Sequence, residues 1–156
     1  MTPSMTTTTE TDRLAELIDK KHEVLAQLSD LGRRQVEFID AGDMSQLFKV
    51  LSAKQRLLIA LQTVERGLDA FRHQDPEQRR WRTAEDRQQC AQITRRCDAL
   101  LSEIMQQERD SEQKLLVRRE ETAQQLQGLH HAAETRSAYA GSAEPVNVHL
   151  DLSTES

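Results

Sequence analysis

Residues 77–127 contain no glycine and no proline, and this uninterrupted stretch constrains the fold more than any other feature of the sequence. Asp75 and Pro76 stand directly before it. Aspartate suits a helix N-cap, and proline suits the first helical position. We therefore predict one long third helix over about 76–137, which would measure roughly 90 Å at the rise per residue of an α-helix.

Two shorter helices are predicted before it, over about 12–40 and 44–74. Ala41-Gly42 ends the first, and Asp43 can cap the second. In each helix, apolar residues recur at alternating steps of three and four, which is a heptad seam. The first seam comprises Leu14, Leu17, Lys21, Val24, Leu28, Leu31, Gln35 and Phe38, and the second comprises Leu47, Val50, Lys54, Leu57, Leu61, Val64, Leu68 and Phe71.

The short link at Gly42 makes these two helices an antiparallel hairpin. Folding there places the two seam lysines beside carboxylates, Lys21 beside Glu65 and Lys54 beside Asp30. A second apolar row widens each seam, as a third packed helix requires. These rows are Ile18, Leu25 and Ile39 in the first helix, and Phe48, Leu51 and Leu58 in the second. The predicted fold is all-α: a helical hairpin packed on a long third helix, as a three-helix coiled-coil-like bundle.

The third helix is longer than the hairpin, whose arms of about 30 residues reach only about 45 Å. Its first part can complete the core with Cys90, Ile93, Cys97, Leu100, Leu101, Ile104 and Met105. The stripe turns polar at Gln107, Glu108 and Ser111, and Leu115, Leu116, Leu126 and Leu129 follow with no hairpin left to cover them. Three arrangements could cover them: a helix of a client protein, a second copy in a homodimer, or a fold-back into a fourth helix. The lack of a helix breaker before Gly128 disfavours the fold-back.

The rest of the chain is predicted to lie outside the bundle, which we place at 12–138. Residues 1–11 form a Thr-rich leader, expected to be disordered, and 139–156 form a flexible acidic tail. Within the tail, 146–152 alternate apolar and polar side chains, a pattern compatible with a strand added to a partner or with disorder. The N-terminus has no secretory signal and no apolar run could span a bilayer, so we expect a cytoplasmic protein.

No motif for catalysis, cofactor binding or metal binding is present, and we expect no enzyme. His130 and His131 are adjacent and would point about 100° apart on a helix, which does not suit a shared metal. Cys90 and Cys97 fall on the seam and are expected to be buried thiols. Trp81 is expected to cap the open end of the bundle. Charged residues make up 30% of the chain without a basic stripe, so nucleic acid is not an expected partner.

The hairpin and the third helix together carry a recognisable pattern. Residues 20–38 read KKHEVLAQLSDLGRRQVEF, and after the Ala41-Gly42-Asp43 break residues 47–65 read LFKVLSAKQRLLIALQTVE. The third helix contains QQERDSEQKLLVRREETAQQL, and Tyr139 follows shortly after it. This pattern, over about 12–140, resembles the FlgN family of flagellar export chaperones. The leader, the segment around Trp81 and the alternating tail have no counterpart in the resemblance.

The resemblance implies that the chain binds hook-filament junction proteins, which are flagellar hook-associated proteins, before their secretion, and that it delivers them to the export apparatus. It also implies that clients bind toward the C-terminal end. The partner-binding residues expected there are Leu115, Leu116, Arg119, Leu126, Leu129 and Tyr139, with Arg118, Glu120 and Glu121 beside them. Two alternatives remain: a structural coiled-coil scaffold that dimerises, and a FliT-type chaperone of the filament cap protein.

Overall fold

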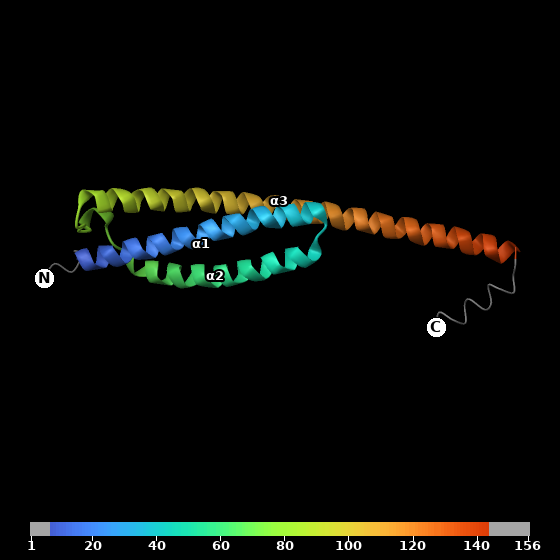
Figure 1. Cartoon of the computed structure of the whole chain (residues 1–156), viewed down its shortest axis with the longest axis horizontal. Helices are drawn as coiled ribbons and strands as arrows, with labels where there is room; N and C mark the ends of the chain where they lie inside the picture. Colours follow the sequence, from blue (N-terminus) through green and yellow to red (C-terminus); the bar gives the residue numbers. More distant parts are fainter. Residues whose placement is uncertain (1–6, 144–156) are drawn as a thin grey trace. The chain divides into compact units, whose positions relative to one another are not determined.

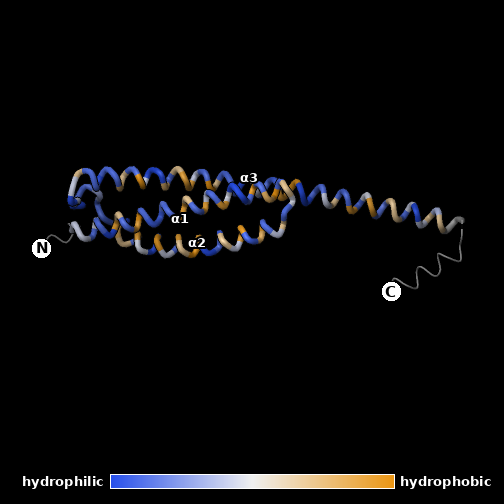
Figure 2. The backbone as a smooth tube through the Cα atoms, viewed as in Figure 1, coloured by the Kyte–Doolittle hydropathy of each residue, from blue (hydrophilic) through white to orange (hydrophobic). Residues whose placement is uncertain are grey.

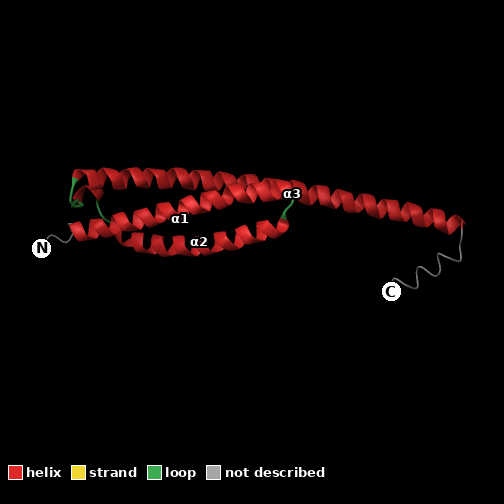
Figure 3. Ribbon diagram, viewed as in Figure 1, coloured by secondary structure: helices red, strands yellow, loops and turns green. Residues whose placement is uncertain are grey.

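The part of the chain that the structure describes folds into three α-helices, as the sequence predicts (Figure 1). The structure, a computed structural model, describes residues 7–143. Its elements are α1 (Thr8–Ala41), α2 (Met44–Arg72), the 3₁₀ helix η1 (Pro76–Gln78) and α3 (Ala84–Ala143). Helices and the loops that join them account for these residues, with no strand among them (Figure 3). The chain divides into two compact units, Met1–Lys114 and Leu115–Ser156.

Helix α1 begins four residues before the predicted start at Asp12, so residues 8–11 of the predicted disordered leader are helical. Thr7 is the N-cap, and its hydroxyl accepts a hydrogen bond from the backbone N–H of Glu10 at 3.2 Å. Thr11 is buried, and its hydroxyl donates to the carbonyl oxygen of Arg80 at 2.7 Å. The threonines of the leader therefore start and anchor the helix, because their hydroxyls can satisfy backbone groups.

The turn between α1 and α2 has the residues that the sequence predicts. Gly42 ends α1 in the left-handed conformation, with φ of 71°, which a residue with a Cβ rarely adopts. Asp43 caps α2, since its carboxylate accepts a hydrogen bond from the backbone N–H of Gln46 at 3.1 Å. The hairpin is therefore fixed by local backbone chemistry at a single point.

The predicted start of the third helix at Pro76 is wrong. Asp75 caps only η1, one turn of 3₁₀ helix, by accepting from the N–H of Glu77 at 3.0 Å. Helix α3 begins at Ala84, where the hydroxyl of Thr83 accepts from the N–H of Asp86 at 3.0 Å. The intervening residues carry Trp81 onto the apolar cluster at this end of the bundle, as predicted. The same capping residues suit an α-helix or a single 3₁₀ turn, so they could not distinguish the two.

The core consists of two apolar clusters within the first unit. Figure 2 shows that hydrophobic and hydrophilic residues alternate along the helices. The cluster at the open end comprises Leu14, Leu17, Ile18, Val64, Leu68, Phe71 and Cys90, with Trp81 and Ile93 packed against it. The second cluster comprises Leu25, Leu28 and Cys97, with Val24, Leu57, Leu61, Ile93, Leu100, Leu101 and Ile104 around it. Each fully buried aliphatic side chain contributes about 1.5–3 kcal/mol to folding. Residues from all three helices therefore form the core, as predicted, but Met105, which was expected to join it, is 57% exposed.

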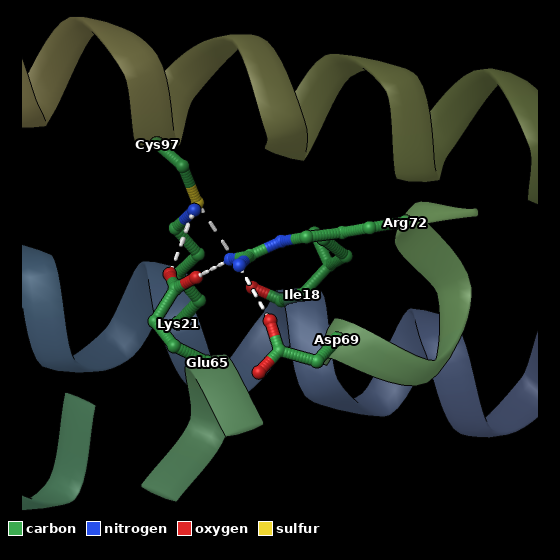
Figure 4. Close-up of polar contacts among 6 residues, drawn as sticks. All are labelled: Ile18, Lys21, Glu65, Asp69, Arg72 and Cys97. Carbon is green, nitrogen blue, oxygen red and sulfur yellow. Dashed lines mark hydrogen bonds and ion pairs between the residues drawn. The ribbon is translucent and has the colours of Figure 1, made fainter. Parts of the chain in front are cut away.

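The predicted pairing of Lys21 with Glu65 is confirmed. The Lys21 ammonium lies 3.0 Å from a carboxylate oxygen of Glu65, on the adjacent helix (Figure 4). Arg72 pairs with the same carboxylate and with Asp69. Beside this network, the thiol of Cys97 lies 4.0 Å from the carbonyl oxygen of Ile18, which brings α3 against α1. The Lys21–Glu65 pair of this network joins the two helices of the hairpin near the edge of its core.

Helix α3 continues without a break through residues 106–113 to Ala143. The fold-back into a fourth helix is therefore excluded for the described part of the chain. Residues 139–143, predicted as the start of the flexible tail, are the last turn of α3, and the alternating segment 146–152 lies outside the described residues. Between residues 7 and 143, no helix has an apolar stretch long enough to cross a membrane.

Candidate functional site

The second unit places all of the apolar residues predicted to bind a partner on the exposed surface of α3. Leu126 is 62% exposed, Leu129 is 68% exposed and Tyr139 is 76% exposed. Leu115 and Leu116 are also exposed, as is Val117, which the sequence reasoning did not single out. A group of exposed apolar side chains often marks a contact site, so a helix segment that exposes six of them is a candidate contact surface.

Helical geometry separates the predicted residues into groups. An α-helix advances by about 100° per residue, so Leu126 lies three turns after Leu115 on nearly the same side, and Leu129 follows within one turn. We call Leu115, Leu126 and Leu129 the distal row. Leu116 lies about 100° from Leu115, and Tyr139 lies about 140° from Leu126. The structure therefore brings three of the predicted leucines onto one face and leaves Leu116 and Tyr139 on other faces.

Charged residues flank the distal row. Arg119, Glu120 and Glu121 are exposed, and Arg118 is half-buried. Arg119 lies one turn after Leu115, near the same face, and occupies part of the gap between Leu115 and Leu126. The row is thus an interrupted apolar strip with mixed charge beside it, which favours contact with an amphipathic helix.

The apolar stripe of α3 turns polar at Gln107, Glu108 and Ser111, as predicted. The Gln107 side-chain amide donates to the carbonyl oxygen of Ser29 on α1 at 3.0 Å. This close approach depends on Gly32, because a Cβ there would lie 2.0 Å from the amide oxygen of Gln107. Ser111 is buried, and its hydroxyl has no hydrogen-bond partner among the described residues. A polar layer therefore closes the apolar core at this end of the first unit.

Lys54 belongs to this polar layer. The prediction that it lies beside Asp30 is wrong. Its ammonium donates to the amide oxygen of Gln35 at 2.7 Å and pairs with the carboxylate of Glu108 on α3. Asp30 instead pairs with Arg33 on its own helix. Within the hairpin alone α1 offers Asp30 as the nearest acid, but Glu108 on α3 lies closer to Lys54. Burial lowers the pKa of Lys54, although the Glu108 carboxylate lies beside it.

The two cysteines are free and buried, as predicted. Burial raises the pKa of both thiols, and nearby carboxylates, Asp19 among them, add to the rise. A thiol with a raised pKa is a poor nucleophile, because the thiolate is the reactive form. Among residues 7–143, no group of three or more His, Cys, Asp or Glu side chains is arranged to hold a metal ion.

A second exposed apolar surface, which was not predicted from the sequence, lies on α2. Phe48, Leu51 and Leu58 were predicted to widen the seam against a third helix, and all three are exposed. The corresponding row of α1 is buried: Leu25 and Ile39 are both fully covered. Equal heptad patterns on the two helices thus have different environments. The only sequence signal for this exposure was that the α2 row lies to one side of the buried seam on the same helix.

Comparisons with known proteins agree with the resemblance. The family model described as FlgN protein matches residues 5–147, nearly the whole chain. Neither the curated proteins nor the solved structures contain a match. A family model that covers this much of the chain, over a bundle of the predicted architecture, shows the family. The chain belongs to the FlgN family of flagellar export chaperones, whose members bind protein clients.

Proposed function

We propose that the protein holds flagellar hook-associated proteins in the cytoplasm before their export, and that the distal row of α3 binds an amphipathic helix of the client. The observation that carries the proposal is the exposure of Leu126 and Leu129 on a helix of an export chaperone. The row would insert between apolar side chains of the client helix, in the way that helices pack into grooves. Arg119 and its charged neighbours would select among clients by charge.

The size of the interaction suits a carrier that must release its client. Burying three leucines contributes about 1.5–3 kcal/mol each, before the cost of ordering both partners is subtracted. The net affinity is then moderate, and the gap in the row between Leu115 and Leu126 reduces it further. Tyr139 lies on a different side of α3 from Leu126. It therefore suits a separate contact, for which the export apparatus that receives the client is the candidate.

The test is client binding by a variant that disrupts the distal row. Leu126→Glu/Leu129→Glu is expected to weaken binding of the purified hook-associated proteins by at least about tenfold, because it places two charges in an apolar contact. The matched control is Gln124→Glu/Gln127→Glu, which adds the same charge on other faces of the same helix. Isothermal titration calorimetry measures both affinities.

Three outcomes contradict the proposal. Equal affinities for the two variants would place the client elsewhere. Binding of the filament cap protein, in place of the hook-associated proteins, would favour the FliT-type alternative. Light scattering that shows a tight dimer, dissociated by Leu126→Glu/Leu129→Glu, would assign the row to a scaffold built from two copies.

A further inference from the structure

The second exposed surface is a row of five large apolar side chains on α2, none of which the distal row includes. Phe48 is 66% exposed and Ile59 is 56% exposed, and the other members are exposed as well. We call this set the outer α2 row; it comprises Met44, Phe48, Leu51, Leu58 and Ile59. It lies within the first unit, beside the buried seam that holds α2 to the bundle.

The spacing of the outer α2 row is that of a helix-binding seam. Met44, Phe48, Leu51 and Leu58 follow steps of four, three and seven, so they occupy one side of the helix. Gln55 fills the intermediate position of the same row. The row spans about 22 Å from Met44 to Ile59, which matches roughly four turns of a partner helix. Scattered apolar residues need no explanation, but a heptad-spaced row on one face is a contact surface.

The charge beside this row is of one sign. Residues 44–64 contain no aspartate and no glutamate. Their exposed cations are Lys49, one position after Phe48, and Arg56, one position after Gln55, and neither has an ion-pair partner in the described part of the chain. The third cation, Lys54, is buried and paired with Glu108. The free edge of the row is therefore basic, and it complements a helix that carries carboxylates along one edge.

The same charge disfavours a second copy of this chain as the occupant. Two α2 helices packed antiparallel through this row would bring the basic edge of one against the basic edge of the other. Like charges placed together oppose association. The partner that fits is a different helix, apolar on one side and acidic beside it.

We propose that the outer α2 row is a docking surface, separate from the distal row, that binds one amphipathic helix of another protein with aspartate or glutamate along the edge of its apolar face. The surface belongs to the folded bundle, so it is available whether or not the distal row is occupied. The protein would then hold two helices at once, one on each surface.

The test uses the full chain and two synthetic 18-residue helical peptides with leucines in heptad spacing. One peptide has glutamate at the flanking positions, and the other has lysine at the same positions. Fluorescence anisotropy is expected to show that the glutamate peptide binds at least about tenfold more tightly. Because the whole chain has a net charge of −5, non-specific attraction would favour the lysine peptide. A preference for glutamate must therefore come from the local basic edge.

Variants locate the binding. Phe48→Glu/Leu58→Glu is expected to lower the affinity for the glutamate peptide at least about tenfold. Lys49→Glu/Arg56→Glu is expected to reverse the preference, so that the lysine peptide binds more tightly. Gln124→Glu/Gln127→Glu adds the same charge as the first variant, outside both apolar rows, and is expected to leave peptide binding unchanged. Circular dichroism confirms that each variant is folded, as expected for substitutions of exposed side chains.

Each other outcome overturns the inference. Equal binding of both peptides would show that the basic edge selects nothing. Loss of peptide binding in Leu126→Glu/Leu129→Glu, with no loss in Phe48→Glu/Leu58→Glu, would move the contact to the distal row. Light scattering that detects a dimer dissociated by Phe48→Glu/Leu58→Glu would make a second copy the occupant. None of these results depends on whether the distal row binds a flagellar client.

Discussion

The two halves of α3 belong to one continuous helix, but they differ in the burial of their apolar residues. The first half, up to Lys114, buries Cys90 and Cys97 and holds polar contacts to both other helices. The second half exposes every large apolar side chain that it has up to residue 140. The difference teaches that the second half keeps its helical conformation without contacts from other helices. Its resistance to local opening, in contrast, does depend on such contacts.

The composition of the second half explains how it remains helical without cover. Residues 115–127 are mostly Leu, Arg, Glu, Ala and Gln, which are good helix formers, and Gly128 is the first breaker. A helix already nucleated in the first half needs only to propagate, and propagation costs far less than nucleation. The local free energy of opening should nevertheless be small, because few buried contacts oppose it.

The largest expected effect is on stability, from the same substitution in the covered and uncovered regions. Leu28→Ala removes a side chain from the buried cluster that packs on the first half of α3, and should lower the free energy of unfolding by about 2–5 kcal/mol. Leu129→Ala removes an exposed one and should change it by less than about 0.5 kcal/mol. Urea unfolding followed by circular dichroism measures both. Equal losses would mean that Leu129 is covered in solution.

Thiol reactivity gives the next largest difference. Cys97 is 1% exposed and burial raises its pKa, so both access and thiolate content are low. A cysteine introduced by Leu126→Cys should react with a thiol reagent at pH 8 roughly a hundredfold faster than Cys90 or Cys97, because these require opening of the bundle. The chain in guanidinium chloride, where all three thiols should react alike, is the control. A rapid reaction of Cys97 in the native protein would show that the first half of α3 is not packed.

The sequence predicted those features that depend on neighbouring residues or on simple helix register. The Gly42-Asp43 turn follows from local backbone chemistry, and the Lys21–Glu65 pair follows from folding two regular helices at that turn. The buried cysteines follow from periodicity in the same way. The exposure of the distal leucines was reached by comparing helix lengths, whereas their role in binding remains a prediction.

Features that depend on how three helices are rotated about their axes could not be predicted. Periodicity shows that Phe48 and Leu25 both lie in second apolar rows, but not which row faces α3, and only Leu25 is buried. The partner of Lys54 depends on the same rotation. The start of α3 was missed for a different reason: the hydroxyl of Thr11 and the ring of Trp81 hold residues 79–83 against the bundle through contacts distant in sequence.

A smaller effect is expected at the polar layer, where the covered half of α3 ends. Burial lowers the pKa of Lys54 below its ordinary 10.5, so the folded state binds fewer protons than the unfolded state between the lowered pKa and 10.5. Stability relative to Lys54→Met should therefore rise with pH across that window and level off above it. Both proteins keep Cys90 and Cys97, whose raised pKa values act in the opposite direction and cancel in the difference.

Urea unfolding of the two proteins from pH 7 to about pH 11 measures this difference. Lys49→Met, which removes an exposed lysine from the same helix, is the control. Its stability relative to Lys54→Met should rise with pH as that of the wild type does. A difference between wild type and Lys54→Met that stays constant with pH would show that Lys54 is solvated in the folded protein. The Glu108 carboxylate would then be the only reason for its position.

The smallest effect compares two glycines, one in each unit. A Cβ at Gly128 would meet no atom within 4 Å, so Gly128→Ala should stabilise its part of α3 by about 1 kcal/mol through helix propensity alone. At Gly32 the same change displaces the Gln107 side chain and its hydrogen bond to Ser29, which costs about 0.5–1.5 kcal/mol and offsets the gain. Hydrogen exchange of the surrounding amides should slow about fivefold for Gly128→Ala and not for Gly32→Ala. If Gly32→Ala slowed exchange equally, Gln107 would not lie against α1, and the covered half of α3 would end earlier than the polar layer.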